Sequence, residues 1–132
     1  MRFFLLASIG GALGAGGRYL VNVACTHCLA PGFPWATFVV NIVGSLLMGI
    51  VVAGIVPALG GSPNWRTFLA TGILGGFTTF SAFSLDAVEL MQRQQISTAL
   101  IYIAGSVALS IAALLAGLAL GGFAVTRMGL AR

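Results

Sequence analysis

The stretch GGFTTFSAF, residues 75–83, gathers glycine, hydroxyl and aromatic side chains inside an otherwise apolar segment. Adjacent glycines followed by threonine and serine make a poor helix interior, because glycine is flexible and the hydroxyls offer the backbone competing hydrogen bonds. The pattern predicts a helix that is broken here. Backbone carbonyls freed by a break can bind a cation. Taken without its neighbours, the glycine pair fits a notch for close helix packing equally well.

Phe80 and Phe83 are spaced to lie on one face of the helix that follows the break. An aromatic ring is negative on its face and positive on its edge, so a ring edge can contact an anion without carrying a charge. Paired phenylalanines in a membrane segment commonly serve as core or lipid-facing side chains instead. The anion hypothesis therefore depends on the polar groups at the same depth.

Polar side chains from two other segments fall at the depth of Phe80. A helical rise of about 1.5 Å per residue places Asn41 about 9 Å below one membrane face. Phe80 lies about 22 Å from the opposite face of a layer about 30 Å thick, so the two residues share a level. Tyr102, Ser106 and Ser110 follow at four-residue spacing and form a stripe that descends from about 7 to about 19 Å.

Arg18 reaches roughly the same level from the first segment, near enough to the membrane face for its side chain to extend toward water. Each group also has an ordinary structural interpretation: the serines can bond back to their own helix, Asn41 can bridge two helices, and Arg18 can anchor the interface. Together they supply hydrogen-bond donors and ring edges but no lysine, whose fixed charge would hold an anion too tightly for release. The residues alone predict a path for a small anion.

The composition identifies the elements that must position these groups. Of 132 residues, 59% are hydrophobic and 6% are charged, and the mean hydropathy of +1.09 excludes an ordinary soluble domain. Small residues at four-residue spacing, such as Gly117 and Gly121, predict close helix packing. At about 20 apolar residues per crossing, we expect one all-α integral membrane domain over residues 1–132. Its four transmembrane helices are expected at approximately 3–24, 35–57, 65–91 and 97–123, with the third broken near the bilayer midplane.

Charge is sparse and gives only a weak orientation preference. Four spans place both termini and the second connection on one side, with Arg2, Arg66, Arg127 and Arg132; the other side has Arg93 and Arg18. The excess of positive charge favours cytoplasmic termini, but it is small enough to allow both orientations. The arginines are scattered singly rather than gathered into a basic patch, so no nucleic-acid partner is expected.

The segment CTHC places Cys25, His27 and Cys28 together, in what the sequence predicts to be a short connection after the first helix. A closed zinc site needs four ligands and this segment offers three. Haem attachment needs histidine directly after the second cysteine, where the chain has Leu29. We therefore interpret these side chains as incidental. They are also the only grouped nucleophile and base, so an enzyme is not expected.

Three stretches, GGALGAGGRY (10–19), VNIVGSLLMG (40–49) and GILGGFTTFSAFSLD (72–86), resemble the signature segments of the Fluc (CrcB-type) fluoride channels of bacteria. The likeness covers essentially the whole chain in length, helix count and motif order. It implies an antiparallel, dual-topology homodimer of four-helix subunits in the lipid bilayer of the inner membrane. Such a dimer has two pores that export fluoride passively and so reduce its toxicity in the cytoplasm.

The resemblance also implies roles for individual residues. Asn41, Ser106 and Ser110 match polar pore-lining positions, with Tyr102 and Arg18 nearby. The edges of Phe80 and Phe83 are implied to face fluoride. The backbone carbonyls of Gly75 and Thr78, taken from both subunits, are implied to hold a structural sodium ion, Na⁺, that is not transported.

Two positions depart from the family pattern within the third stretch. Ala82 stands where threonine or serine is usual, and Asp86 stands where glutamate is typical. CTHC is not part of the pattern. These departures bear on fine tuning rather than on class.

Two rival functions remain open from the sequence. A small four-helix proton-coupled multidrug transporter needs a carboxylate within the membrane, commonly in the first helix, and only Asp86 is available at depth. A non-transporting membrane assembly subunit predicts that the purified protein passes no ion.

Overall fold

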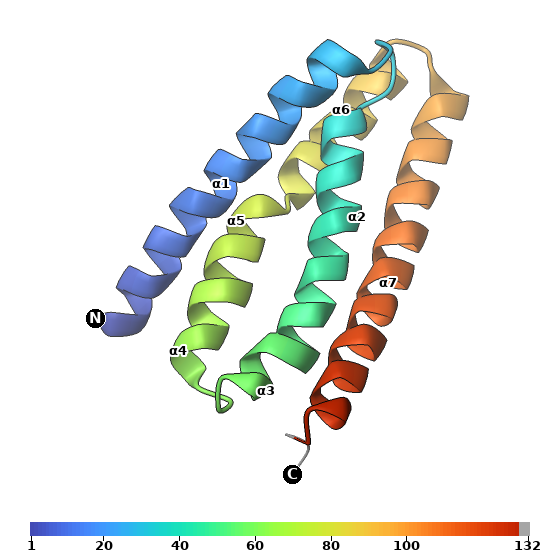
Figure 1. Cartoon of the computed structure of the whole chain (residues 1–132). Coiled ribbons are helices and arrows are strands. Elements are labelled where there is room, and N and C mark those ends of the chain that lie inside the picture. The colour runs from blue at the N-terminus through green and yellow to red at the C-terminus, as the bar shows by residue number, and fades with distance from the viewer. Residues whose placement is uncertain (130–132) are drawn as a thin grey trace.

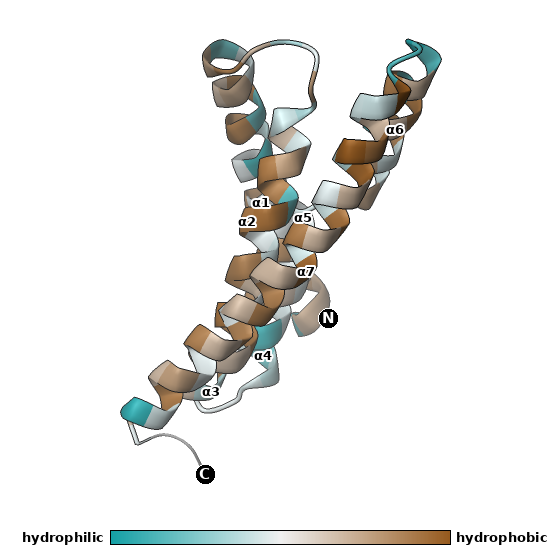
Figure 2. Cartoon of the chain, turned by 90° about the vertical axis from the view of Figure 1, so that its right-hand side faces the viewer, coloured by the Kyte–Doolittle hydropathy of each residue, from teal (hydrophilic) through white to brown (hydrophobic). Residues whose placement is uncertain are grey.

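The computed structural model describes residues 1–129, and within them the chain forms four long helical spans (Figure 1). Each span is long and apolar enough to cross a membrane, with mean hydropathies between 1.3 and 2.5. Hydrophobic residues run along the helices, and polar residues gather mainly near their ends (Figure 2). The first and fourth spans are α1 (Arg2–Cys28) and α7 (Ile96–Arg127). The second consists of α2 (Trp35–Ile50), the π-helical η1 (Val51–Ile55) and α3 (Val56–Ala58), and the third of α4 (Pro63–Arg66), the π-helical η2 (Thr67–Leu74), α5 (Gly75–Phe77) and α6 (Phe80–Gln92).

The start of α1, the connection between α3 and α4, and the end of α7 lie at one end of the bundle (Figure 1). The α1–α2 and α6–α7 connections lie at the other end. Arg2, Arg66 and Arg127 therefore share the first end, while Arg132 lies outside the described residues. Pro63 begins the third span earlier than the expected Trp65, because Ser62 caps it by accepting a hydrogen bond from the Asn64 amide at 3.3 Å.

Helix α1 ends later than the sequence predicts, at Cys28 instead of near Ala24. The Leu29 amide donates to the Cys25 carbonyl at 3.0 Å, and the Thr26 hydroxyl donates to the Asn22 carbonyl at 2.8 Å. No proline or glycine lies between Gly17 and Pro31, so nothing ends the helix sooner in that stretch. The placement of Cys25, His27 and Cys28 in a connection is therefore wrong: they form the last turn of a helix.

Glycines allow the spans to approach closely along two seams. α1 packs along η2 and α5, and α2 with η1 packs along α7. A side chain at Gly14 would collide with the backbone of Ile73, and one at Gly117 would collide with the Leu46 carbonyl and Gly49. Without a hydrophobic driving force between helices in lipid, such contacts are a main source of association.

Between α5 and α6 the backbone is extended at two residues. Thr78 has φ −76° and ψ 158°, and Thr79 has φ −154° and ψ 123°. Gly75 keeps helical angles, so the extended residues follow the glycine pair rather than coincide with it. The threonine hydroxyls satisfy the local backbone: that of Thr79 accepts from the Ala82 amide at 3.2 Å and caps α6, and that of Thr78 donates to the Leu74 carbonyl at 2.9 Å.

Candidate functional site

A cavity of about 330 Å³ lies between α2, α6, α7 and the extended residues that precede α6. Its polar lining comes from amide and hydroxyl side chains, with no charged residue: Asn41, Ser45, Thr78, Thr79, Ser106 and Ser110. Phe80 and Phe83 also line it. Side chains predicted to share a depth, from segments far apart in the chain, thus border one space.

Asn41 on α2 holds the extended backbone at Thr79. Its Oδ1 accepts from the Thr79 amide at 2.9 Å, and its Nδ2 donates to the Thr79 carbonyl at 3.0 Å. Because the amide donor and the carbonyl acceptor are fixed, the orientation of the Asn41 side chain is fixed too. Nδ2 carries two hydrogens, so the second remains available to a ligand in the cavity.

Ser106 and Ser110 present hydroxyls with no hydrogen-bond partner within residues 1–129, although both oxygen atoms are buried. Other hydroxyls in these helices do bond back to their own backbone, as Thr126 does to the Gly122 carbonyl at 2.9 Å. The ordinary interpretation of the two serines therefore does not hold. An unsatisfied buried hydroxyl costs roughly 1–3 kcal/mol, so these groups are suited to a polar ligand.

The two phenylalanines differ in exposure. The Phe80 side chain is 78% exposed on this chain, whereas Phe83 is only 9% exposed. Their ring centroids are 5.5 Å apart with the planes at 41°. Phe83 packs on Tyr102 with ring centroids 5.3 Å apart, and this contact helps to fix its position.

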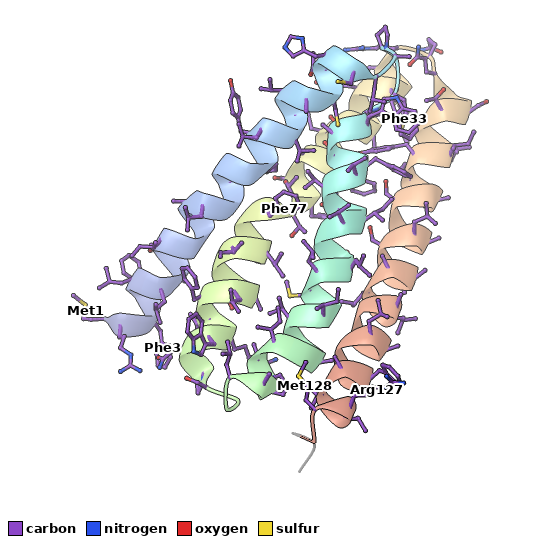
Figure 3. All side chains as sticks on the ribbon, viewed as in Figure 1. Met1, Phe3, Phe33, Phe77, Arg127 and Met128 are labelled. Carbon is purple, nitrogen blue, oxygen red and sulfur yellow. The ribbon has the colours of Figure 1, made fainter. Side chains whose placement is uncertain are left out.

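Tyr102 does not line the cavity, in contrast to its predicted place in the stripe with the serines. It is completely buried and donates from its hydroxyl to Asp86 Oδ2 at 3.1 Å. Phe33, in the α1–α2 connection (Figure 3), meets it edge-on with centroids 5.5 Å apart. Tyr102 thus links α7, α6 and a connection, and it supports the cavity wall through Phe83.

Arg18 is separated from the serines as well. It lines a second cavity of about 480 Å³ together with Asp86, at the level of the α1–α2 end. Thr79 borders both this cavity and the one around Asn41, so the two spaces adjoin at that residue.

The carbonyls of Gly75 and Thr78 lose their usual helical donors to side chains. In a continuous helix the Thr79 amide would donate to Gly75 and the Ala82 amide to Thr78. Here the first donates to Asn41 and the second to the Thr79 hydroxyl. Both carbonyls are thereby free to accept from, or to coordinate, another group.

The sequence interpretation did not assign Thr79 to the site and took Ser45 only as a small packing residue, although both line the cavity. Thr79 is the more informative omission, because its backbone binds Asn41 and its hydroxyl caps α6. A threonine directly before the first helical residue is a recognisable N-cap, because its hydroxyl can accept from the amide three residues later, and the TT pair offered such a residue.

A match to a known family model identifies the family of this chain. The family model described as CrcB-like protein, Camphor Resistance (CrcB), matches residues 5–118. This chain belongs to the CrcB family.

Curated relatives include three proteins named Fluoride-specific ion channel FluC. That of Rhizobium meliloti (strain 1021) is 50% identical over 120 residues, 91% of this chain and 96% of the relative. That of Agrobacterium fabrum (strain C58 / ATCC 33970) is 52% identical over 116 residues, 88% and 93%. That of Cereibacter sphaeroides (strain ATCC 17029 / ATH 2.4.9) is 53% identical over 115 residues, 87% and 90%.

The matched CrcB region contains the cavity, the extended residues and the close contacts of Gly14 with Ile73 and of Gly117 with Gly49. With four spans of sufficient length and hydropathy, the chain is a multi-pass protein of the bacterial inner membrane. The resemblance seen in the three sequence stretches is confirmed at the level of the family.

Proposed function

We propose that this chain is a fluoride-specific ion channel that carries F⁻ passively out of the cytoplasm. The observation that carries the proposal is the pair of buried, unpartnered hydroxyls of Ser106 and Ser110, which share a cavity with the spare Asn41 hydrogen. A dehydrated halide needs hydrogen-bond donors close around it. The relatives at about half identity bear this function in their names.

The electrostatics of the cavity suit an anion. Asn41 and the two serines offer donors, the edges of Phe80 and Phe83 are weakly positive, and no charged side chain borders the space. Helix α6 begins at Phe80, and the N-terminus of a helix favours negative charge. These partial charges attract an anion without holding it as a lysine would.

The end of α5, just before the extended residues, is suited to bind a cation. The Gly75 and Thr78 carbonyls belong to the C-terminal end of α5, where helix dipoles are negative. Freed carbonyls at discontinuous membrane helices coordinate Na⁺ in other transport proteins. We therefore assign these two carbonyls to a structural Na⁺, which would hold the third span in its broken form near the bilayer midplane.

The functional unit in this proposal is an antiparallel homodimer with dual topology and two pores. Gly75 and the Phe80 side chain are exposed on a single chain, although both belong to the proposed ion sites. A second copy placed against this surface would bury Phe80 and complete the carbonyl shell around Na⁺. The small arginine difference between the two ends is compatible with insertion in either orientation.

Efflux from liposomes tests the function directly. Vesicles loaded with fluoride or with chloride, and containing the purified full-length chain, should release fluoride much faster than chloride. Phe80→Ile should reduce fluoride efflux at least tenfold while the dimer persists on size exclusion, because it removes the ring edge. Phe123→Ile is the matched control, since Phe123 is also exposed but lies away from the cavity on α7. Equal release of the two halides would refute the proposal.

Replacing sodium tests the carbonyl site separately. Exchange of Na⁺ for N-methylglucamine during purification and assay should lower fluoride efflux several-fold, because the Gly75 and Thr78 carbonyls then lack their cation. Readdition of Na⁺ should restore the rate. Unchanged efflux in the absence of sodium would remove Na⁺ from the proposal but leave the anion path intact.

The rival functions gain no support from the relatives' names. In the multidrug-transporter alternative Asp86 would exchange protons, yet its carboxylate is engaged by the Tyr102 hydroxyl. Fluoride efflux that is independent of a proton gradient would argue against that alternative, and any selective efflux would argue against an assembly subunit.

A further inference from the structure

Cys25 and Cys28 form a pair of thiols on one face of the last turn of α1. The Leu29 amide donates to the Cys25 carbonyl at 3.0 Å, so the turn that contains both cysteines is a regular helical turn. Side chains three residues apart on a helix have Cβ atoms about 5–6 Å apart. Both thiols are free; Cys25 is half-buried and Cys28 is exposed.

This spacing suits a shared metal ion better than a disulfide. A disulfide requires Cβ atoms about 3.5–4.5 Å apart, which is shorter than the helical separation. Two thiolates bound to one metal ion can hold their sulfur atoms up to roughly 4.6 Å apart, twice a metal–sulfur bond of about 2.3 Å. The helix can therefore remain intact while both sulfurs bind the same ion.

We propose that Cys25 and Cys28 bind a single soft monovalent cation of the Cu(I) class in two-coordinate geometry. Thiolate ligands select soft ions such as Cu(I). A tetrahedral zinc ion would need further ligands, and residues 1–129 contain no group of three His, Cys, Asp or Glu side chains that could hold a metal. His27 is two positions from Cys25, so it does not share the face of the two thiols.

Binding changes the charge at this position. Both thiols lose their protons when the metal binds, and two protons leave to solvent. Two thiolates and one monovalent cation carry one net negative charge, where the free thiols carried none. The site thus converts a neutral turn of helix into an anionic one.

Cys25, one member of the thiol pair, lies at the outer end of a row of cavities. Cys25 lines a cavity of about 380 Å³ that is also bordered by Thr37 and Asp86. Thr37 and Asp86 border the Arg18 cavity as well, and that cavity adjoins the Asn41 cavity at Thr79. Negative charge at this entrance should slow the arrival of an anion. This consequence for flux rests on the proposed channel function, whereas metal binding does not.

Metal binding is tested on the purified full-length chain in detergent, with Cu(I) supplied as its bicinchoninate complex. The chain should remove one copper ion per polypeptide from the complex. Cys25→Ser and Cys28→Ser should each abolish this transfer, and His27→Ala, the control from the same turn, should retain it. Absence of transfer to the unaltered chain, or equal transfer to the serine variants, would overturn the proposal.

Fluoride efflux measures the consequence. Cu(I) should slow efflux several-fold for the unaltered chain but not for Cys25→Ser, and removal of copper by a chelator should restore the rate. Copper that binds without altering efflux would overturn the assignment of the pair to the entrance. Absence of efflux even without copper would count against the channel function, while the copper stoichiometry would still decide the thiol site.

Discussion

At the scale of single residues, the decisive feature is the contrast between hydroxyls that are satisfied locally and hydroxyls that are not. Ser84 and Thr126 donate to carbonyls one turn earlier in their own helices, both at 2.9 Å. Ser106 and Ser110 do not, and their oxygens are buried. The sequence alone left both outcomes open, because the spacing of serines in a helix does not determine their side-chain rotamers. An unsatisfied pair is retained at a cost that bound fluoride would offset.

Ser110→Ala separates a ligand-binding role from a structural one. We expect fluoride efflux to fall about tenfold, because a hydrogen bond to a charged group contributes about 1.5–3 kcal/mol. The thermal stability of the protein in detergent, measured without fluoride, should stay equal or rise, since the substitution removes an unsatisfied polar atom. Thr126→Ala, which removes a locally satisfied hydroxyl from the same helix, should leave efflux unchanged. A lower Tm with normal efflux for Ser110→Ala would assign Ser110 to structure only.

At the scale of elements, the sequence predicted the helices better than it predicted their ends and rotations. Apolar length alone indicates four spans, because each crossing has the same minimum requirement. Depth counted at about 1.5 Å per residue predicted one level for Asn41 and Phe80, and both residues line one cavity. It could not place Tyr102, because four residues turn a helix by about 400°, so a stripe drifts by about 40° at each step. By Tyr102 the drift from Ser110 is about 80°, which is enough to turn the ring toward Phe83 and Asp86.

The close packing of α2 against α7 leads to a prediction about stability. Gly117→Ala should destabilise the protein by about 1–3 kcal/mol, because the new methyl group would collide with the Leu46 carbonyl and Gly49. Gly122→Ala is the matched control on the same helix, since a methyl group there meets no neighbour within 4 Å. The measurement is the Tm of each purified variant in the same detergent. Equal Tm values for the two variants would show that the seam can separate without cost.

At the scale of the whole molecule, a single chain leaves its proposed ion sites partly open. Phe80 is 78% exposed and Gly75 is exposed too, so the completed sites depend on what covers this face. The family resemblance supplied the expectation of a second, inverted copy. The residues alone did not, because helix count and hydropathy are the same for a monomer and a dimer. The small difference in arginine number between the two ends of the bundle is compatible with both orientations but does not select either.

Labelling of one native thiol tests dual topology in cells. With Cys25→Ser, the remaining Cys28 is an exposed thiol at the α1–α2 end. In spheroplasts, a membrane-impermeant maleimide should modify about half of the chains if the protein inserts equally in both orientations. The other half should react only after permeabilisation. Modification of all chains or of none before permeabilisation would indicate a single orientation.

Helix α7 passes the cavity without interruption, and this fixes the spacing between the two serines that an ion would contact in turn. Ser106 and Ser110 lie on one regular helix, so their backbone positions are held about 6 Å apart. Two hydrogen bonds of about 2.8 Å laid end to end barely span that gap. In the proposed channel, an ion bound at one hydroxyl would therefore weaken that hydrogen bond as it forms the next, so that it would cross the cavity in two steps. An unchanged fluoride efflux rate after removal of both the Ser106 and Ser110 hydroxyls would rule out this two-step passage.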